Sequence, residues 1–160
     1  MTESIELAVI GAGPAGLAAA GQAAELGLSV TLIDTFALPG GQYYKQTPPE
    51  LGETAPPDAS ARELWAGVDQ EGVRLLSGTS VWGIFPENDA HTLCLYGPPG
   101  TPRRLQAQTV ILAPGDYHRP APFPGWTLPG VMTAGAAMAM VKHQHVLPGR
   151  RIMLSGTGPL

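Results

Sequence analysis

The sequence predicts an α/β protein built around a parallel sheet, and two observations carry this prediction. Near the N-terminus an apolar run at residues 5–10 (IELAVI) is followed by a glycine-rich turn, an alanine-rich stretch at residues 14–26 and a second apolar run at residues 29–34. Later, residues 109–113 (TVILA) form the continuous apolar run that is typical of a strand buried on both faces of a parallel sheet. Strand, helix and strand in this order indicate the crossover that parallel neighbours require.

The turn between the first strand and the helix reads Gly11-Ala12-Gly13-Pro14-Ala15-Gly16, which matches the Gly-x-Gly-x-x-Gly fingerprint of dinucleotide binding. Gly11 permits the tight turn, Gly13 permits a pyrophosphate to approach the backbone, and Gly16 lets the helix pack against the strand. The phosphates would then face free N–H groups at the positive end of the helix dipole. Asp34 follows Gly16 by 18 residues, and an acid at about 20 residues is expected to bond the ribose hydroxyls. The alternative is a glycine turn in an ordinary parallel sheet.

The C-terminal end repeats the pattern. Residues 151–155 (RIMLS) predict a strand, and Gly156-Thr157-Gly158 follows it, 145 positions after the first fingerprint. A sequence pattern that recurs within one chain indicates a repeated structural unit. We therefore expect a second dinucleotide-binding unit to begin here without its helix, with Gly156 and Gly158 as its candidate cofactor contacts and the chain as an N-terminal fragment of a larger protein. A chance Gly-Thr-Gly sequence is the alternative.

The middle of the chain predicts a smaller antiparallel motif. A surface loop is expected at residues 47–58, a helix at 60–70 with Ser60 as its N-cap, a strand at 73–76, three antiparallel strands at 79–85, 91–96 and 103–107, a separate central strand at 109–113, a proline-rich linker at 116–130 and a helix at 133–146 capped by Thr133. The expected domains are residues 1–115 for the first part of the cofactor domain, 116–150 for a crossover linker with a helix, and 151–160 for the start of the second unit.

Composition excludes several classes of function. Of the 160 residues 44% are hydrophobic and 14% charged, which favours a folded chain over a disordered one. The net charge of −4 and the lack of a basic cluster argue against a nucleic-acid partner. The single cysteine, Cys94, permits neither an internal disulfide nor a dithiol site, and no metal site is expected. No signal sequence or membrane span is recognisable, so a cytoplasmic location is expected.

The order of these elements resembles that of flavoproteins with two dinucleotide-binding domains, in which the first unit binds FAD and an inserted second unit binds NAD(P). The run VILAPGDYHRPAPFPGWTLPGVMTAGAAMAM is similar to a narrower branch of amine- and amino-acid-oxidising subunits. That branch includes hydrogen cyanide synthase, the A subunit of opine oxidase and the alpha subunit of sarcosine oxidase. Gly40-Gly41-Gln42 matches a motif common in this branch. The resemblance implies a Rossmann-like FAD-binding domain, a parallel sheet with a three-stranded antiparallel meander, truncated at the start of its second unit.

The resemblance also implies a set of cofactor contacts. It assigns Gly11, Gly13, Pro14, Ala15 and Gly16 to the FAD pyrophosphate, Asp34 to the adenosine ribose, Gly41 and Gln42 to the ribityl chain or ring, the backbone of Val81 to adenine, and Ala113 and Gly115 to the end of the central strand beside the cofactor. The chain departs from the usual Ala-Thr-Gly at Ala113-Pro114-Gly115, where proline removes a backbone donor.

The expected function is that of an FAD-dependent oxidoreductase subunit, which oxidises an amine or amino acid by hydride transfer to flavin. The catalytic residues are not identified by the sequence. The expected partners are a small-molecule substrate and other oxidoreductase subunits, and NAD(P) is a further cofactor at the second site. One alternative is an NAD(P)H-dependent flavin reductase that passes electrons to a protein. Another is an inactive fragment or nucleotide-binding module, because the 160 residues alone are expected to bind FAD weakly or not at all.

Overall fold

The computed structural model describes residues 3–47, 59–117 and 119–156. The chain divides into two compact units, Met1–Gln46 with Ala55–Gly115, and Thr47–Thr54 with Asp116–Leu160. Most of the expected loop at residues 47–58, as well as His118 and Gly158, lies outside the described residues. Each unit is described by itself.

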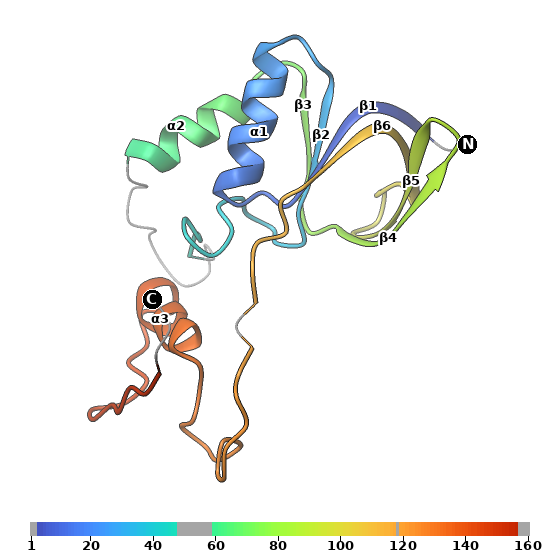
Figure 1. The fold of residues 1–160 in the computed structure, drawn as a ribbon. Helices are drawn as coiled ribbons and strands as arrows, with labels where there is room; N and C mark the ends of the chain where they lie inside the picture. Colours follow the sequence, from blue (N-terminus) through green and yellow to red (C-terminus); the bar gives the residue numbers. More distant parts are fainter. Residues whose placement is uncertain (1–2, 48–58, 118, 157–160) are drawn as a thin grey trace. The chain divides into compact units, whose positions relative to one another are not determined.

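The first unit is built on a six-stranded sheet in the order β3-β2-β1-β6-β5-β4 (Figure 1). Strands β1 (Glu3–Ile10), β2 (Val30–Ile33), β3 (Val73–Leu76) and β6 (Arg104–Leu112) are parallel, whereas β5 (Ala90–Tyr96) is antiparallel to both β6 and β4 (Ser80–Glu87). The predicted fold class, a parallel sheet with an antiparallel meander, is confirmed.

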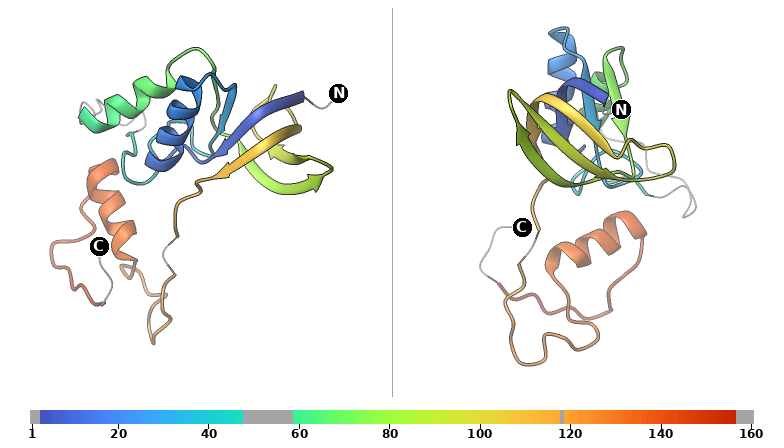
Figure 2. Two further views of the ribbon diagram at one scale, coloured as in Figure 1. Left: turned by 45° about the horizontal axis from the view of Figure 1, so that its top comes forward. Right: turned by 90° about the vertical axis from the view of Figure 1, so that its right-hand side faces the viewer.

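Alternate residues of β1 point to opposite faces of the sheet, and a hydrophobic cluster buries each face. Leu7 and Val9 pack with Leu17 of α1 (Pro14–Glu25) and with Leu32 of β2, on the face that α2 (Ala59–Val68) also covers. Ala8 belongs to a second cluster with Ile33, Leu93, Leu95, Leu105 and Ala107. Figure 2 shows the sheet curving round where β4 and β5 continue from β6, and β5 and β6 supply four of the six residues of this second cluster. The helices therefore cover one face of β1, which leads into the glycine turn, and the curved part of the sheet closes over its other face.

One strand replaces two expected ones. The predicted third meander strand at residues 103–107 and the predicted central strand at 109–113 are a single strand, β6. Its first half pairs with β5, from Cys94 opposite Arg104 to His91 opposite Ala107. Nearly its whole length pairs with β1, up to Leu112 opposite Ile10. No glycine or proline interrupts residues 103–112, so the backbone can stay in register across the polar Gln108.

Two further expectations were wrong in detail. Ser60 lies inside α2, which begins at Ala59, so it is not the N-cap. Residues 151–155 are not a strand. Ile152, Met153 and Leu154 are 67%, 94% and 76% exposed, and a lone segment has no ladder to satisfy its backbone groups.

The second unit contains α3 (Ala134–Gln144), preceded by irregular chain. The hydroxyl of Thr133 accepts the N–H of Ala136 at 3.2 Å, which confirms the predicted N-cap. The helix ends earlier than predicted because His145 adopts a left-handed conformation with φ of 55°. Among the described residues, no helix is both long and apolar enough to cross a bilayer.

Candidate dinucleotide-binding site

The glycine turn lies at the carboxyl ends of the parallel strands, where the chain leaves β1. The N–H of Gly11 donates to the carbonyl of Ile33 at 2.8 Å, and the N–H of Ala113 donates to the carbonyl of Ile10 at 2.8 Å. Gly11 has φ of +104°, and a Cβ there would lie 2.1 Å from the carbonyl oxygen of Ala113. Only glycine fits this position, as the sequence predicted.

The other two fingerprint glycines differ sharply from each other. A Cβ on Gly16 would lie 1.7 Å from the carbonyl oxygen of Gly11, so the helix packs against the turn as expected. A Cβ on Gly13 would meet its nearest atom, the Cα of Gly41, only at 3.8 Å. Gly11 and Gly16 are therefore required by the fold, whereas Gly13 leaves space that the protein itself does not fill.

The first turn of α1 presents unpaired backbone donors. Gly13 is the N-cap in an extended conformation, no side chain caps the helix, and Pro14 occupies its first turn. The first in-helix bond runs from the N–H of Leu17 to the carbonyl of Gly13 at 2.9 Å. The preceding N–H groups of a helix have no acceptor within it, and they carry the positive end of its dipole. Since the first turn contains no acidic side chain, this end is suited to an anion.

A loop from β2 lies directly against this turn. The N–H of Gly40 donates to the carbonyl of Ala12 at 2.7 Å. Gly41 has φ of +61°, and a Cβ there would lie 2.8 Å from the Cα of Gly13. The consecutive glycines thus let two backbones approach each other beside the open space, and Gln42 follows in an exposed position.

Asp34 joins the turn to the loop. Its Oδ2 accepts the N–H of Ala12 at 2.5 Å and its Oδ1 accepts the N–H of Phe36 at 2.7 Å. The carboxylate is buried, with 8% of Asp34 exposed. Each carboxylate oxygen has a second lone pair, so both can accept a further hydrogen bond. The expected contact with ribose stays a prediction, but Asp34 already has a structural role that the sequence did not indicate.

The remaining candidates lie on neighbouring elements. The N–H of Thr79 donates to the carbonyl of Asp34 at 2.7 Å, and the hydroxyls of Thr35 and Ser80 are 3.3 Å apart. These contacts place the start of β4, with the partly buried Val81, beside the end of β2. Ala113 and Gly115 follow β6, and Gly115 is exposed with φ of +73°.

The second fingerprint belongs to the other unit of the chain. Gly156 is exposed, and an added Cβ there would have no atom within 4 Å. Gly158 lies outside the described residues. The expected second dinucleotide site therefore stays a prediction.

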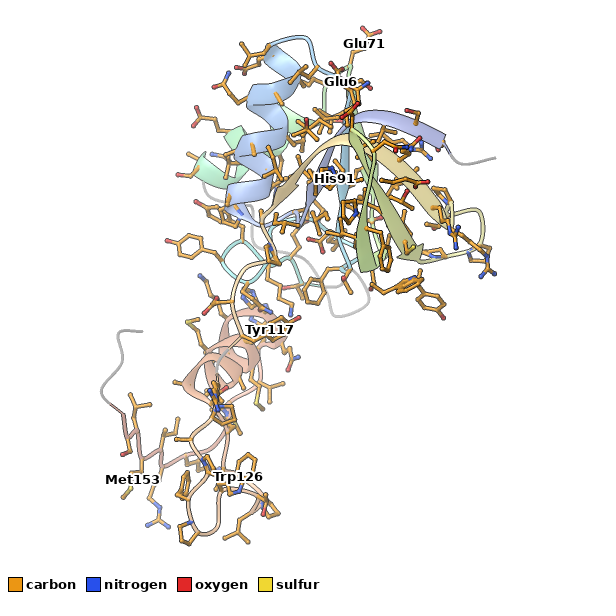
Figure 3. The ribbon with its side chains drawn as sticks, turned by 45° about the vertical axis from the view of Figure 1, so that its right-hand side comes forward. Glu6, Glu71, His91, Tyr117, Trp126 and Met153 are labelled. Carbon is orange, nitrogen blue, oxygen red and sulfur yellow. The ribbon has the colours of Figure 1, made fainter. Side chains whose placement is uncertain are left out.

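Acidic side chains, in contrast to the uncharged glycine turn, lie at the other end of the parallel strands. Glu6 of β1 and Glu71 lie near the amino ends of β2 and β3 (Figure 3), and Glu6 accepts the N–H of Ser29 at 2.9 Å. Within the described residues, no group of three or more histidine, cysteine and acidic residues could hold a metal ion. Cys94 is buried in β5 with 3% of its surface exposed.

Sequence reasoning missed two features of the site. Gly40 has φ of +125° and bonds the fingerprint turn, which its place in a glycine pair could have suggested. Lys45 lies with its Nζ 4.8 Å from the ring centroid of Phe36, the residue bonded to Asp34. No pattern in the sequence relates these two side chains, because they meet only when the loop folds back.

The parallel strands, the glycine turn and the uncapped helix beside it are the features of a dinucleotide-binding α/β domain. The chain belongs to the pyridine nucleotide-disulphide oxidoreductase family, which matches residues 5–159.

The curated relatives include the three proteins that the sequence resembled. The chain is 35% identical to the A subunit of opine oxidase from Agrobacterium tumefaciens over 168 residues, covering 100% of this chain and 33% of that protein. It is 29% identical to the HcnB subunit of hydrogen cyanide synthase from Pseudomonas protegens over 160 residues, covering 98% and 34%. It is 33% identical to the alpha subunit of sarcosine oxidase from Corynebacterium sp. over 166 residues, covering 95% and 17%. The chain thus spans about a third or less of the length of these relatives.

A solved structure has a similar fold. The fold superimposes on L-proline dehydrogenase from P. horikoshii with a TM-score of 0.73 and 25% identity, covering 94% of this chain and 31% of that one. The resemblance to this branch of flavoproteins is confirmed.

Proposed function

We propose that this chain forms the FAD-binding part of an oxidoreductase subunit that oxidises an amine or amino acid by hydride transfer to flavin. The observation that carries the proposal is the open space at Gly13, which lies between an uncapped helix N-terminus and the Gly40-Gly41 backbone. A pyrophosphate requires both features, since it needs backbone donors and close approach.

The substrate class is supported by the relatives. Opine oxidase and sarcosine oxidase act, by their names, on opines and sarcosine, and the solved structure is named for L-proline. These are amino acids with substituted nitrogen, which supports oxidation beside a nitrogen atom. The names of the relatives also specify subunits, so we propose other oxidoreductase subunits as partners.

The chemistry would belong largely to the cofactor. A bound flavin would supply the hydride acceptor, while the protein holds it in position and excludes water. The turn would hold the pyrophosphate, Asp34 the ribose, and Gly41 and Gln42 the part of FAD nearer the ring. The buried Cys94 is the chain's only cysteine, so no dithiol of this chain takes part.

An NAD(P)H-dependent flavin reductase is the second candidate. The family description, which includes pyridine nucleotides, favours it. It would require NAD(P) at the unit that begins with Gly156, and reduction of bound flavin by NADH or NADPH without an amine would distinguish it from the first proposal.

The test is Gly13→Val in the protein that carries this chain. The valine would occupy the space for the pyrophosphate, and we expect FAD affinity to fall at least about tenfold, or 1.4 kcal/mol. The Cβ would meet its nearest non-neighbouring atom, the Cα of Gly41, at an ordinary 3.8 Å, but valine is a poorer N-cap residue than glycine. The free energy of unfolding without cofactor should therefore fall by about 1 kcal/mol or less. The control is Ala18→Val, which places the same valine side chain on the exposed side of α1. Flavin absorbance and denaturant unfolding are the measurements. A Gly13→Val protein that retains flavin at the parent's stoichiometry would contradict the proposal.

A further inference from the structure

The segments around the candidate site are unbalanced in charge. The turn Gly11–Gly16 contains no charged side chain, and residues 34–46 contain two, Asp34 and Lys45. A pyrophosphate is doubly negative and would lie near Asp34, which is negative as well. The helix dipole supplies roughly half a positive charge at its N-terminus. A further positive charge would strengthen binding of this anion, and Lys45 is the one basic residue that these segments offer.

The fold fixes Lys45 close to the turn. The N–H of Tyr44 donates to the carbonyl of Gly40 at 3.0 Å, and the amide of Gln46 donates to the carbonyl of Pro39 at 3.0 Å. Gly40 is itself bonded to Ala12. The short segment that carries Lys45 is thus closed on itself and held against the fingerprint.

The ammonium of Lys45 is held without being neutralised. Its Nζ lies over the ring of Phe36, 4.8 Å from the centroid, and the side chain is partly buried. Within the described residues no carboxylate lies in ion-pair distance of Lys45. An aromatic face attracts a cation but leaves its full charge available to a nearby anion. The backbone N–H of Phe36 donates to Oδ1 of Asp34. Phe36 therefore connects the ammonium of Lys45 with the residue that is expected to contact the ribose.

We propose that Lys45 is the cation of the dinucleotide site, held over Phe36 so that its charge attracts the pyrophosphate of the cofactor. This inference rests on the proposed function. It assigns a charge-based role in binding to a residue outside the fingerprint. The role is electrostatic, so it must weaken with salt: the Debye length falls from about 30 Å at 0.01 M to about 3 Å at 1 M.

The experiment compares Lys45→Met with Lys45→Arg in the protein that carries this chain. Methionine keeps much of the length and removes the charge, whereas arginine keeps the charge and the contact with the ring. Arg62→Met is the matched control, since Arg62 is an exposed basic residue of α2. The probes are FAD, and ADP and adenosine as competitors, because ADP carries the phosphates that adenosine lacks. Dissociation constants are measured across the salt range.

Lys45→Met should weaken FAD and ADP about tenfold at low salt, which corresponds to one step of 1.4 kcal/mol. The difference should vanish at 1 M salt, and adenosine should bind unchanged. Lys45→Arg and Arg62→Met should each stay within about twofold of the parent.

Three results would overturn the inference. If FAD binds to the parent but Lys45→Met shows the same affinity and salt dependence, Lys45 is not the cation, although the proposed function stands. If adenosine is weakened as much as ADP, the residue acts on the shape of the site rather than through charge. If the parent binds neither FAD nor ADP, the proposed function itself fails, and this inference fails with it.

Discussion

The two fingerprint sequences of this chain have very different structures. The first follows β1, which is paired along one side with β2 and along the other with β6, and Val9 beside it is fully buried. The second follows residues 151–155, which form no strand and expose Met153 almost completely (Figure 3). Both have an apolar run before Gly-x-Gly. The comparison teaches that this local pattern specifies a strand and turn only when neighbouring strands satisfy the backbone groups.

The largest effect is expected where the first turn is most tightly packed. Gly16→Ala would place a methyl group 1.7 Å from the carbonyl oxygen of Gly11, so turn and helix must separate. We expect the free energy of unfolding to fall by about 3 kcal/mol. The control is Gly149→Ala in the second unit, where the nearest contact would be an ordinary 3.6 Å, so little change is expected. Urea unfolding measures both. Equal effects would mean that the first turn is not specially constrained.

A smaller effect is expected at the residue that ties the first turn to its surroundings. Asp34→Ala leaves the N–H groups of Ala12 and Phe36 without their acceptor, and Ala12 is fully buried. We expect a loss of about 2 kcal/mol in the free energy of unfolding without cofactor. Asp34→Asn keeps one acceptor oxygen and should lose less.

Asp34→Ala also separates the structural role of Asp34 from its expected contact with the ribose. If the ribose contact exists, FAD affinity falls by a further 1–3 kcal/mol, roughly, beyond the effect on the free protein. FAD titration of the folded variant measures this. An unchanged affinity would leave Asp34 with its structural role alone.

The smallest effect is expected in the second unit. Thr133→Ala removes the hydroxyl that accepts the N–H of Ala136, and should destabilise α3 by about 1 kcal/mol. Hydrogen exchange of the α3 amides should accelerate accordingly. Ser60→Ala in α2 is the comparison, because Ser60 lies within the helix and is not its N-cap. A larger effect at Ser60 than at Thr133 would reverse the assignment of the two positions.

The sequence predicted most of the first unit because its signals are local. The turn after β1 needs glycine at Gly11 and Gly16 for steric reasons that hold wherever strand, turn and helix follow one another. The N-cap at Thr133 was predictable for the same reason, since an N-cap and its donor are close in sequence.

The sequence-based predictions were wrong where the existence of a strand depends on pairing with another strand. The break expected between residues 107 and 109 is absent, because β1 pairs with β6 in the same register on both sides of Gln108, from Leu105 to Leu112. The strand expected at residues 151–155 is absent, because the described chain pairs no strand with it.

The sequence by itself thus determined the strand, glycine turn, helix and strand that define the class of protein, and the space at Gly13. Only the tertiary structure decided that Asp34 bonds Ala12 and Phe36, and that Lys45 rests on Phe36. The physical reason is distance along the chain. Backbone conformation depends on adjacent residues, whereas a buried carboxylate or a loop ammonium takes its partner from whichever segment the fold brings within reach.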